Sequence, residues 1–226
     1  MLASRVLLGA RSTLPSRVYH YDLTIHGALF LSSTPPDRRS TITSYRDASF
    51  LRVLYARMTR NDLGDRDDSN VKWTRDQVDE AREARLHGYE WASHCQGELN
   101  LVRPAKDGSI VVFDDLKDGH LTFAAGSLST PFRPDALRVS PSTGYLFHPS
   151  PPPPPASRRS ALPSTGSRYG PYSLLRSSLV LEHIADSLAL DDNDAGSNGG
   201  GSYEFDGKRY QIEALQADDV WRRIDR

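Results

Sequence analysis

The sequence predicts an α+β protein built from two related units, each made of a β-hairpin, a helix and a second β-hairpin. Short β-prone runs surround a glycine turn twice, at residues 21–31 and at residues 137–148. Each stretch precedes an amphipathic helical pattern, and further strand-like runs follow each helix. An apolar helix stripe needs a sheet face to cover it, so we expect two curved antiparallel sheets, each packed on one helix.

The first unit is expected to span residues 19–130. Its hairpin should turn at His26 and Gly27, because glycine readily takes the positive φ of a two-residue turn. Asp47 is placed to cap a helix over residues 48–60, where apolar side chains recur at the spacing of one helix face.

A polar insertion is expected within the first unit at residues 62–88. Its charges alternate in sign, and Thr74 can cap a short helix as far as Arg85. We expect this helix to be exposed because it has no apolar stripe. The strand-like runs that follow should form one meander, at residues 89–95, 98–102, 109–113 and 120–125.

The second unit is expected to span residues 131–226. Its first hairpin should turn at Gly144, and residues 174–190 have the broad apolar face of a buried helix. The last hairpin has the clearest signal, because Asp206 followed by Gly207 suits a type I′ turn between two alternating runs.

Three stretches of the second unit carry little core-forming sequence. Residues 150–170 hold a polyproline run with Ser, Arg and Gly and are expected to be a disordered loop, so deleting residues 150–168 should leave thermal stability nearly unchanged. Residues 191–202 are interpreted as a flexible glycine-rich loop. Residues 218–224 could add a terminal helical turn.

The amino-terminal stretch has the composition of a mitochondrial presequence, which we place at residues 1–18. It carries Arg5, Arg11 and Arg17 and no acidic residue, although the whole chain has 29 acids. We therefore expect removal after import, up to about Arg17, and a location in the mitochondrial matrix. A disordered basic tail and a plastid transit peptide are the alternatives.

Composition excludes several functional classes. A formal net charge of −1 provides no overall basic field for nucleic acid, and no apolar run is long enough for a membrane helix. One cysteine permits no intrachain disulfide. The chain has no HExxH, paired CxxC, EF-hand, P-loop or GxSxG motif, so we expect no metal and no cofactor.

Two residues are candidates for catalysis. Cys95 is the single thiol, but its neighbour His94 would point to the opposite face of a strand, so any base must come from elsewhere, namely His87, His120 or His148. A lone strand cysteine is more often a small buried residue, and we interpret Cys95 as structural.

Polar residues near strand ends and at a helix start are candidates for binding. Glu98 and Asn100 should share one strand face, with Arg103 at the strand end, so they could hold a polar ligand or form a structural ion pair. Arg176 and Ser177 could bind an anion near the start of the second helix, or Arg176 could bridge the two units.

Several segments together resemble uncharacterised protein family 0598. They are Ser93-x-Cys95-x-x-Glu98-x-Asn100-x-x-Arg103 followed by Val111-Val112-Phe113, then Pro131-Phe132-x-Pro134, Gly144-x-Leu146-Phe147-His148-Pro149 and Arg176-Ser177-x-Leu179-x-x-Glu182. The resemblance implies a small eukaryotic mitochondrial protein. More distantly, the order is similar to bacterial proteins called domain of unknown function 1285, which implies an α+β fold with an internal repeat.

These observations favour a non-enzymatic binding or interaction module, with a protein partner or a small anionic ligand and without nucleic acid. We expect an anion-binding cleft between the two units, because its candidate residues include two arginines and one carboxylate. The alternative is an enzyme of unknown reaction that uses Cys95 or His148. The expected cleft residues are Glu98, Asn100, Arg103, His148 and Arg176, and Ser177 is a further binding candidate beside Arg176. The alternative is that these groups form an internal salt-bridge network that rigidifies the interface between the units.

Overall fold

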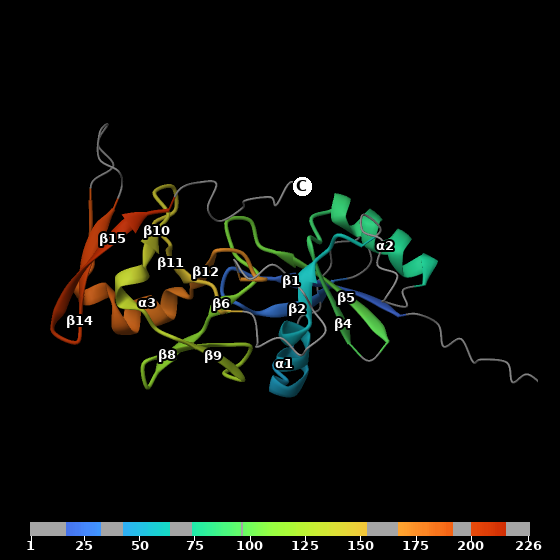
Figure 1. The fold of residues 1–226 in the computed structure, drawn as a ribbon, viewed down its shortest axis with the longest axis horizontal. Coiled ribbons are helices and arrows are strands. Elements are labelled where there is room, and N and C mark those ends of the chain that lie inside the picture. Colours follow the sequence, from blue (N-terminus) through green and yellow to red (C-terminus); the bar gives the residue numbers. More distant parts are fainter. Residues whose placement is uncertain are drawn as a thin grey trace, which may run out of the picture.

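The computed structural model describes residues 17–32, 43–63, 74–95, 97–152, 167–191 and 200–215. The described chain is an α+β protein with three sheets and three α-helices. In Figure 1, α2 (Arg75–Leu86) lies toward one end of the long axis, and α1 (Ala48–Ala56) lies nearer the middle. The other end holds α3 (Ser177–His183), β14 (Gly201–Phe205) and β15 (Lys208–Ala214). None of the described helices is long and apolar enough to span a membrane.

The five-stranded sheet has the order β2-β1-β5-β4-β3. Strands β1 and β5 pair in parallel, and the other neighbours are antiparallel. Strands β1 and β5 are the first and last strands of this sheet along the chain, and they pair in parallel. The prediction of a purely antiparallel sheet is therefore wrong here. The strands are β1 (Val18–Leu23), β2 (Leu29–Ser32), β3 (Met58–Arg60), β4 (Trp91–Cys95) and β5 (Glu98–Pro104).

The β1–β2 hairpin is present, but its connection is longer than two residues. The last register pair is Leu23 with Leu29, and the Gly27 N–H donates to the Thr24 carbonyl at 3.0 Å. Gly27 has a φ of +79°, as expected, and a Cβ there would lie 3.1 Å from the Val112 Cβ. Glycine is therefore needed for both its backbone conformation and its close approach to another sheet.

Helix α1 (Ala48–Ala56) confirms the predicted start and corrects the predicted end. Asp47 Oδ1 accepts the Phe50 N–H at 2.6 Å, which is the expected cap. The helix does not reach residue 60, because Met58–Arg60 forms β3 and pairs with β4. Hydrogen bonds with β4 take the place of those that one more helical turn would have made.

Helix α2 (Arg75–Leu86) begins at the predicted cap, with a capping box between Thr74 and Gln77. It is not simply an exposed insertion. Ala81 and Ala84 are buried in a cluster on the sheet face opposite α1, with Leu99 among its members. Alanines form a narrow buried face, which lacks the large apolar side chains by which an amphipathic helix is usually recognised in a sequence.

The predicted four-stranded meander does not form. Strands β4 and β5 are a hairpin of the first sheet, whereas β6 (Val112–Phe113) pairs in parallel with β12 (Tyr172–Leu175) of another sheet. Residues 120–125 contribute to a separate three-stranded sheet of order β7-β8-β9. Its strands are β7 (Asp115–Lys117), β8 (His120–Phe123) and β9 (Leu128–Pro131).

The seven-stranded sheet has the order β13-β14-β15-β10-β11-β12-β6. Strands β10 and β15 are parallel, as are β12 and β6, and the other neighbours are antiparallel. The 3-10 helices η1 (Pro134–Ala136) and η2 (Ala185–Ser187) precede β10 and β13. The further strands are β10 (Arg138–Val139), β11 (Leu146–Pro149), β12 (Tyr172–Leu175), β13 (Ala189–Leu190), β14 (Gly201–Phe205) and β15 (Lys208–Ala214).

The predicted helix over residues 174–190 is wrong at both ends. Leu174 and Leu175 belong to β12, and the helix α3 is only Ser177–His183. Residues 189–190 form β13. An apolar run of this kind suits a buried strand as well as a helix, and here pairing of β12 with β6 and β11 decides between them.

The β14–β15 hairpin confirms the sequence prediction. Asp206 and Gly207 have φ values of +50° and +69°, as a type I′ turn requires. The preceding glycine-rich stretch extends less far than expected, because Gly201 begins β14. A Cβ on Gly201 would lie 2.6 Å from the Ala189 carbonyl oxygen, and one on Gly200 would lie 2.6 Å from the Ile212 carbonyl oxygen.

We therefore expect Gly201→Ala to destabilise the protein by about 1–3 kcal/mol, because backbone on a neighbouring strand must shift to admit the methyl group. A thermal melt should show a fall of roughly 2–10 °C. Ser129→Ala, at an exposed position of β9, is the matched control and should leave the melting temperature unchanged. Equal melting of both variants would contradict the steric argument.

The proline-rich stretch is anchored at its carboxyl-terminal end. Tyr169 is buried, and its hydroxyl donates to the Tyr55 carbonyl at 2.8 Å. Arg168 Nη1 donates to the Ala56 carbonyl, also at 2.8 Å. The disordered loop predicted for residues 150–170 is therefore wrong at Tyr169, and its central residues 153–166 lie outside the described chain, as do residues 1–16, 192–199 and 218–224.

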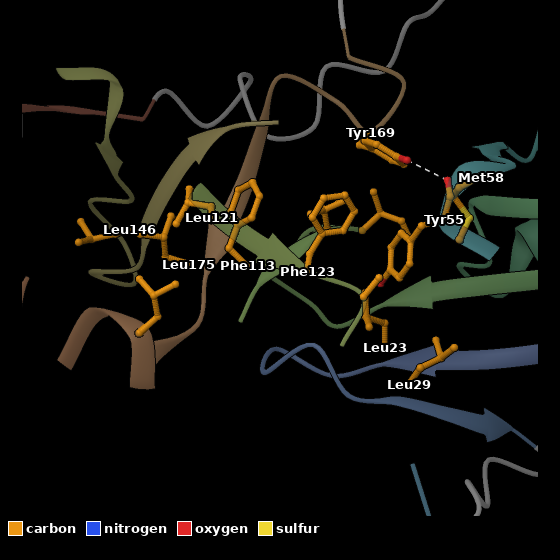
Figure 2. Close-up of a cluster of buried hydrophobic side chains, with 14 of the residues drawn as sticks. Leu23, Leu29, Tyr55, Met58, Phe113, Leu121, Phe123, Leu146, Tyr169 and Leu175 are labelled. Carbon is orange, nitrogen blue, oxygen red and sulfur yellow. Dashed lines mark hydrogen bonds between the residues drawn. The ribbon is translucent and has the colours of Figure 1, made fainter. Parts of the chain in front are cut away.

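One hydrophobic core joins the five-stranded and seven-stranded sheets. Phe123 is central, with its ring centroid 5.7 Å from Tyr55, 6.0 Å from Phe113 and 6.3 Å from Tyr169. Figure 2 shows this row of side chains running from the strands of the first sheet to Leu146 and Leu175 of the second. The two sheets are therefore stabilised by common apolar contacts.

Candidate functional site

Glu98 and Asn100 lie on the face of β5 that α1 covers, whereas Arg103 lies on the opposite face. Strand alternation places Asn100 with its register partner Ser93, whose hydroxyl donates to the α1 carbonyl of Leu54 at 2.8 Å. Asn100 is 1% exposed, and its Nδ2 donates to the Ser93 carbonyl at 3.2 Å. Glu98 is half-buried at the beginning of the strand.

Arg103 is engaged with the β1 strand and with the segment after α2. Its Nη2 and Nε lie 2.7 and 2.8 Å from Asp22 Oδ1, and these two residues are register partners in the parallel pair. The guanidinium also lies over the Tyr89 ring, 4.7 Å from its centroid, and donates to the His87 carbonyl. Its charge is paired within the molecule, so its main effect is to join β1 to β5.

His148 is buried on β11 with both ring nitrogens engaged. Nε2 accepts the Arg133 N–H at 3.0 Å, so the Nδ1–H can donate to the Pro149 carbonyl at 2.8 Å. The Phe113 and Phe132 rings each lie 5.7 Å from the imidazole centroid. Burial lowers the pKa of His148 to about 4, more than the hydrogen bond to Pro149 raises it. His148 is therefore neutral near neutral pH.

Arg176 and Ser177 lie at the junction of β12 and α3. The Arg176 N–H donates to the Phe113 carbonyl at 3.0 Å, so its backbone extends the pairing of β12 with β6. Its side chain is exposed and makes no cap hydrogen bond to the helix. Ser177 is the first residue of a helix of seven residues and is also exposed.

The expected cleft residues are not linked with one another in the described part of the chain. Glu98, Asn100 and Arg103 have partners within the five-stranded sheet and next to it. The hydrogen bonds described for His148 and Arg176 go to backbone near the seven-stranded sheet. Within β5 itself, Arg103 faces away from Asn100, so Arg103 and Asn100 do not line one surface.

Cys95 and His148, the two candidates for catalysis, belong to different sheets. Cys95 is buried, and its Sγ lies 3.3 Å from the Ser93 hydroxyl on the α1 face. Over the ranges that the structure describes, no three His, Cys, Asp or Glu side chains form a group that could hold a metal ion.

The sequence did not indicate an aromatic cluster around Tyr21, on the sheet face that also carries Glu98. The buried Tyr21 ring lies 5.3 Å from the Tyr45 ring and 6.1 Å from the Phe50 ring. Burial raises the pKa of Tyr21, and the nearby hydroxyls of Tyr45 and Tyr19 and the Glu98 carboxylate raise it further. The alternation of Tyr19 with Tyr21 was a signal for this face, but nothing local indicates that Tyr45 joins it.

Comparison with known proteins gives a family and no function. The fold is that of an α+β protein, and the predicted polar residues have separate partners in the described part of the chain. A family model described as Domain of unknown function (DUF4505) matches residues 9–216, so the chain belongs to this family. Neither the curated proteins nor the solved structures contain a match.

Proposed function

We propose that this chain is a non-enzymatic binding or interaction module. The observation that carries the proposal is that both catalytic candidates have structural roles. His148 is neutral and uses both ring nitrogens to hold backbone groups, so it has no free nitrogen with which to accept a proton from a substrate. Cys95 is buried beside Ser93 under α1 and on another sheet, so it lacks this histidine as a base.

The proposal favours a protein partner over a small anion. Arg103 is paired with Asp22 and faces away from Asn100, which removes one of the two arginines from the expected cleft. Of the two cleft arginines, only Arg176 is exposed, and it lies at the beginning of a helix of only two turns. A single exposed guanidinium gives weak recognition of an anion compared with a bidentate, enclosed site.

The test of this function is the state of the protein in its own compartment. We expect it to migrate in native electrophoresis as part of an assembly larger than its mass of 25.2 kDa, and Cys95→Ala to leave that assembly intact. Chemical cross-linking and mass spectrometry would identify the partner. A monomer in the organelle, or labelling of Cys95 by a thiol-directed activity probe, would favour the enzyme instead.

We propose a mitochondrial matrix location, supported by the basic acid-free amino terminus and by the resemblance to uncharacterised protein family 0598. The sheet limits where a presequence can be cut. Leu99 donates to the Arg17 carbonyl at 2.9 Å, and β1 begins at Val18. A cut after residue 17 would remove the Arg17 carbonyl and this hydrogen bond, and a cut after residue 18 would also remove the first strand residue.

We therefore expect the mature chain to retain Arg17. Amino-terminal sequencing of protein purified from the organelle measures the cut directly. An intact Met1 would contradict import with cleavage, and a mature chain beginning at Val18 or later would contradict the structural limit.

We also propose that the two units are copies of one ancestral unit. The support is the strand order: β2-β1-β5-β4-β3 in the first sheet corresponds to β11-β10-β15-β14-β13 in the second. In both, the first and last strands of the set pair in parallel, and a helix precedes the third strand. Strand β12 and the α2 helix are then additions to the common pattern.

Equivalent hydrogen bonds support this correspondence. Ala105 donates to the Leu23 carbonyl at 2.8 Å just beyond the first parallel pair, and Leu215 donates to the Val139 carbonyl at 2.7 Å beyond the second. The preceding register pairs are both ion pairs, with reversed charge: Asp22 with Arg103, and Arg138 with Glu213.

The reversed ion pairs provide a test. Asp22→Arg places two guanidinium groups together and should lower the melting temperature by several degrees, because like charges in register repel. Adding Arg103→Glu recreates the polarity of the second unit and should restore most of that loss. If the double variant is less stable than the single one, the two positions are not equivalent.

A further inference from the structure

The α1 face of the five-stranded sheet combines partly exposed aromatic rings with the accessible carboxylate of Glu98. We call Tyr19, Leu31, Tyr45, Phe50 and Glu98 the aromatic surface. Tyr45 is 37% exposed, the Glu98 side chain is 36% exposed, and the other three residues are half-buried. Aromatic residues are enriched in protein–protein interfaces, whose rims are polar.

The rings of the aromatic surface are held in place from below. The Tyr45 ring lies 5.4 Å from Phe50 and 5.3 Å from the buried Tyr21, whose register partner on β2 is Leu31. Tyr45 is also fixed by its backbone N–H, which donates to the Leu29 carbonyl at 2.8 Å. The exposed edges are therefore preorganised, which reduces the entropy lost when a partner binds.

The carboxylate of Glu98 is available to a second cation. Arg17 Nη1 lies 3.7 Å from Glu98 Oε1, and the Arg17 side chain is 66% exposed. An exposed ion pair at this distance contributes little free energy, so another guanidinium can replace it. The position of Arg17 shows that a guanidinium group fits beside this carboxylate.

We propose that the aromatic surface binds a partner-protein segment that presents an arginine next to an apolar side chain. The guanidinium of the partner's arginine pairs with Glu98 and stacks on a tyrosine ring of this surface. A planar guanidinium stacks on an aromatic ring better than the ammonium group of lysine does. The apolar neighbour covers Tyr45 and Phe50. This inference rests on the proposed function and names the chemistry of the partner.

The probe is acetyl-Arg-Phe-amide, titrated into the full chain and followed by backbone amide shifts in NMR spectra. Acetyl-citrulline-Phe-amide is the matched peptide, because it keeps the shape of arginine without the charge. We expect the arginine peptide to bind at least fivefold more tightly, with the largest shifts at Tyr19, Tyr45 and Glu98. Glu98→Gln should remove the fivefold preference, and Tyr45→Ser should weaken both peptides.

Two control variants lie on another surface. Glu182→Gln and Leu181→Ser change side chains of α3 that are 71% and 70% exposed, and both should leave the affinities unchanged. Equal affinity of the two peptides, or shifts centred outside the aromatic surface, would overturn the proposal. If removing residues 1–16 raises the affinity tenfold, the occupant is this chain's own basic segment and a partner is not required.

Failure here is distinguishable from failure of the proposed function. A stable assembly in the organelle whose cross-links avoid Tyr19 and Tyr45 would retain an interaction module and reject this surface. A monomeric protein without partners would reject both.

Discussion

Replacing Tyr169 with alanine should destabilise the protein by about 3–5 kcal/mol, the usual cost of removing a buried aromatic ring. Tyr169 is 5% exposed and packs against Phe123 in the core that both sheets share. Its hydroxyl also donates a hydrogen bond to the Tyr55 carbonyl, one of the carbonyls at the end of α1. Tyr169→Phe keeps the ring and loses only this hydrogen bond, at a cost of about 1 kcal/mol. Urea unfolding of both variants measures the difference.

The matched control is a deletion of residues 153–166, which precede this anchor. Their composition buries little apolar surface, and shortening a loop changes its closure entropy only slightly, so we expect a change below about 1 kcal/mol. The longer deletion of residues 150–168 should now cost more than the sequence predicted, because it removes Arg168 and its hydrogen bond to Ala56. If the shorter deletion destabilises as much as Tyr169→Ala, the loop itself contributes to the core.

The stability of the protein should fall between pH 6.5 and pH 4, and His148 should account for a large part of the fall. Its folded-state pKa of about 4 lies below the ordinary histidine pKa of 6.5, so protons bind the unfolded chain first as the pH decreases. The folded state therefore loses stability through this window, by about 3 kcal/mol for one group with this shift. Above about pH 7.5 the histidine is almost entirely neutral in both states, and this contribution is nearly constant.

His148→Gln tests this account, because glutamine does not titrate in this range. We expect the variant to be less stable at pH 7.5, since it lacks the imidazole that accepts the Arg133 N–H, but to lose less stability on acidification. His94→Gln is the control. Burial and Arg57 also lower the pKa of His94, but this residue lies at a more open position, so its replacement should change the slope less than His148→Gln does. Chemical unfolding at pH 7.5, 6 and 4.5 measures the slopes. Equal slopes for wild type and His148→Gln would contradict the neutral, buried state of His148.

The candidate site was only partly predictable from the sequence. Glu98 and Asn100 share a strand face, as alternation indicated, and Cys95 is a buried residue beside Ser93. Alternation also implies that Arg103 points the other way, but it cannot show that Asp22, 81 positions away, neutralises its charge. The role of His148 depended on Arg133 and two phenylalanines that fold around it.

The sequence by itself determined the features that depend on neighbouring residues. Asp47 and Thr74 cap their helices, and Asp206 with Gly207 turns its hairpin, because each satisfies backbone groups or backbone angles within a few positions. Only the tertiary structure decided that β1 pairs with β5 and that residues 58–60 leave the helix for a strand. These outcomes depend on hydrogen bonds from strands far away along the chain, and local propensity is too weak to oppose them.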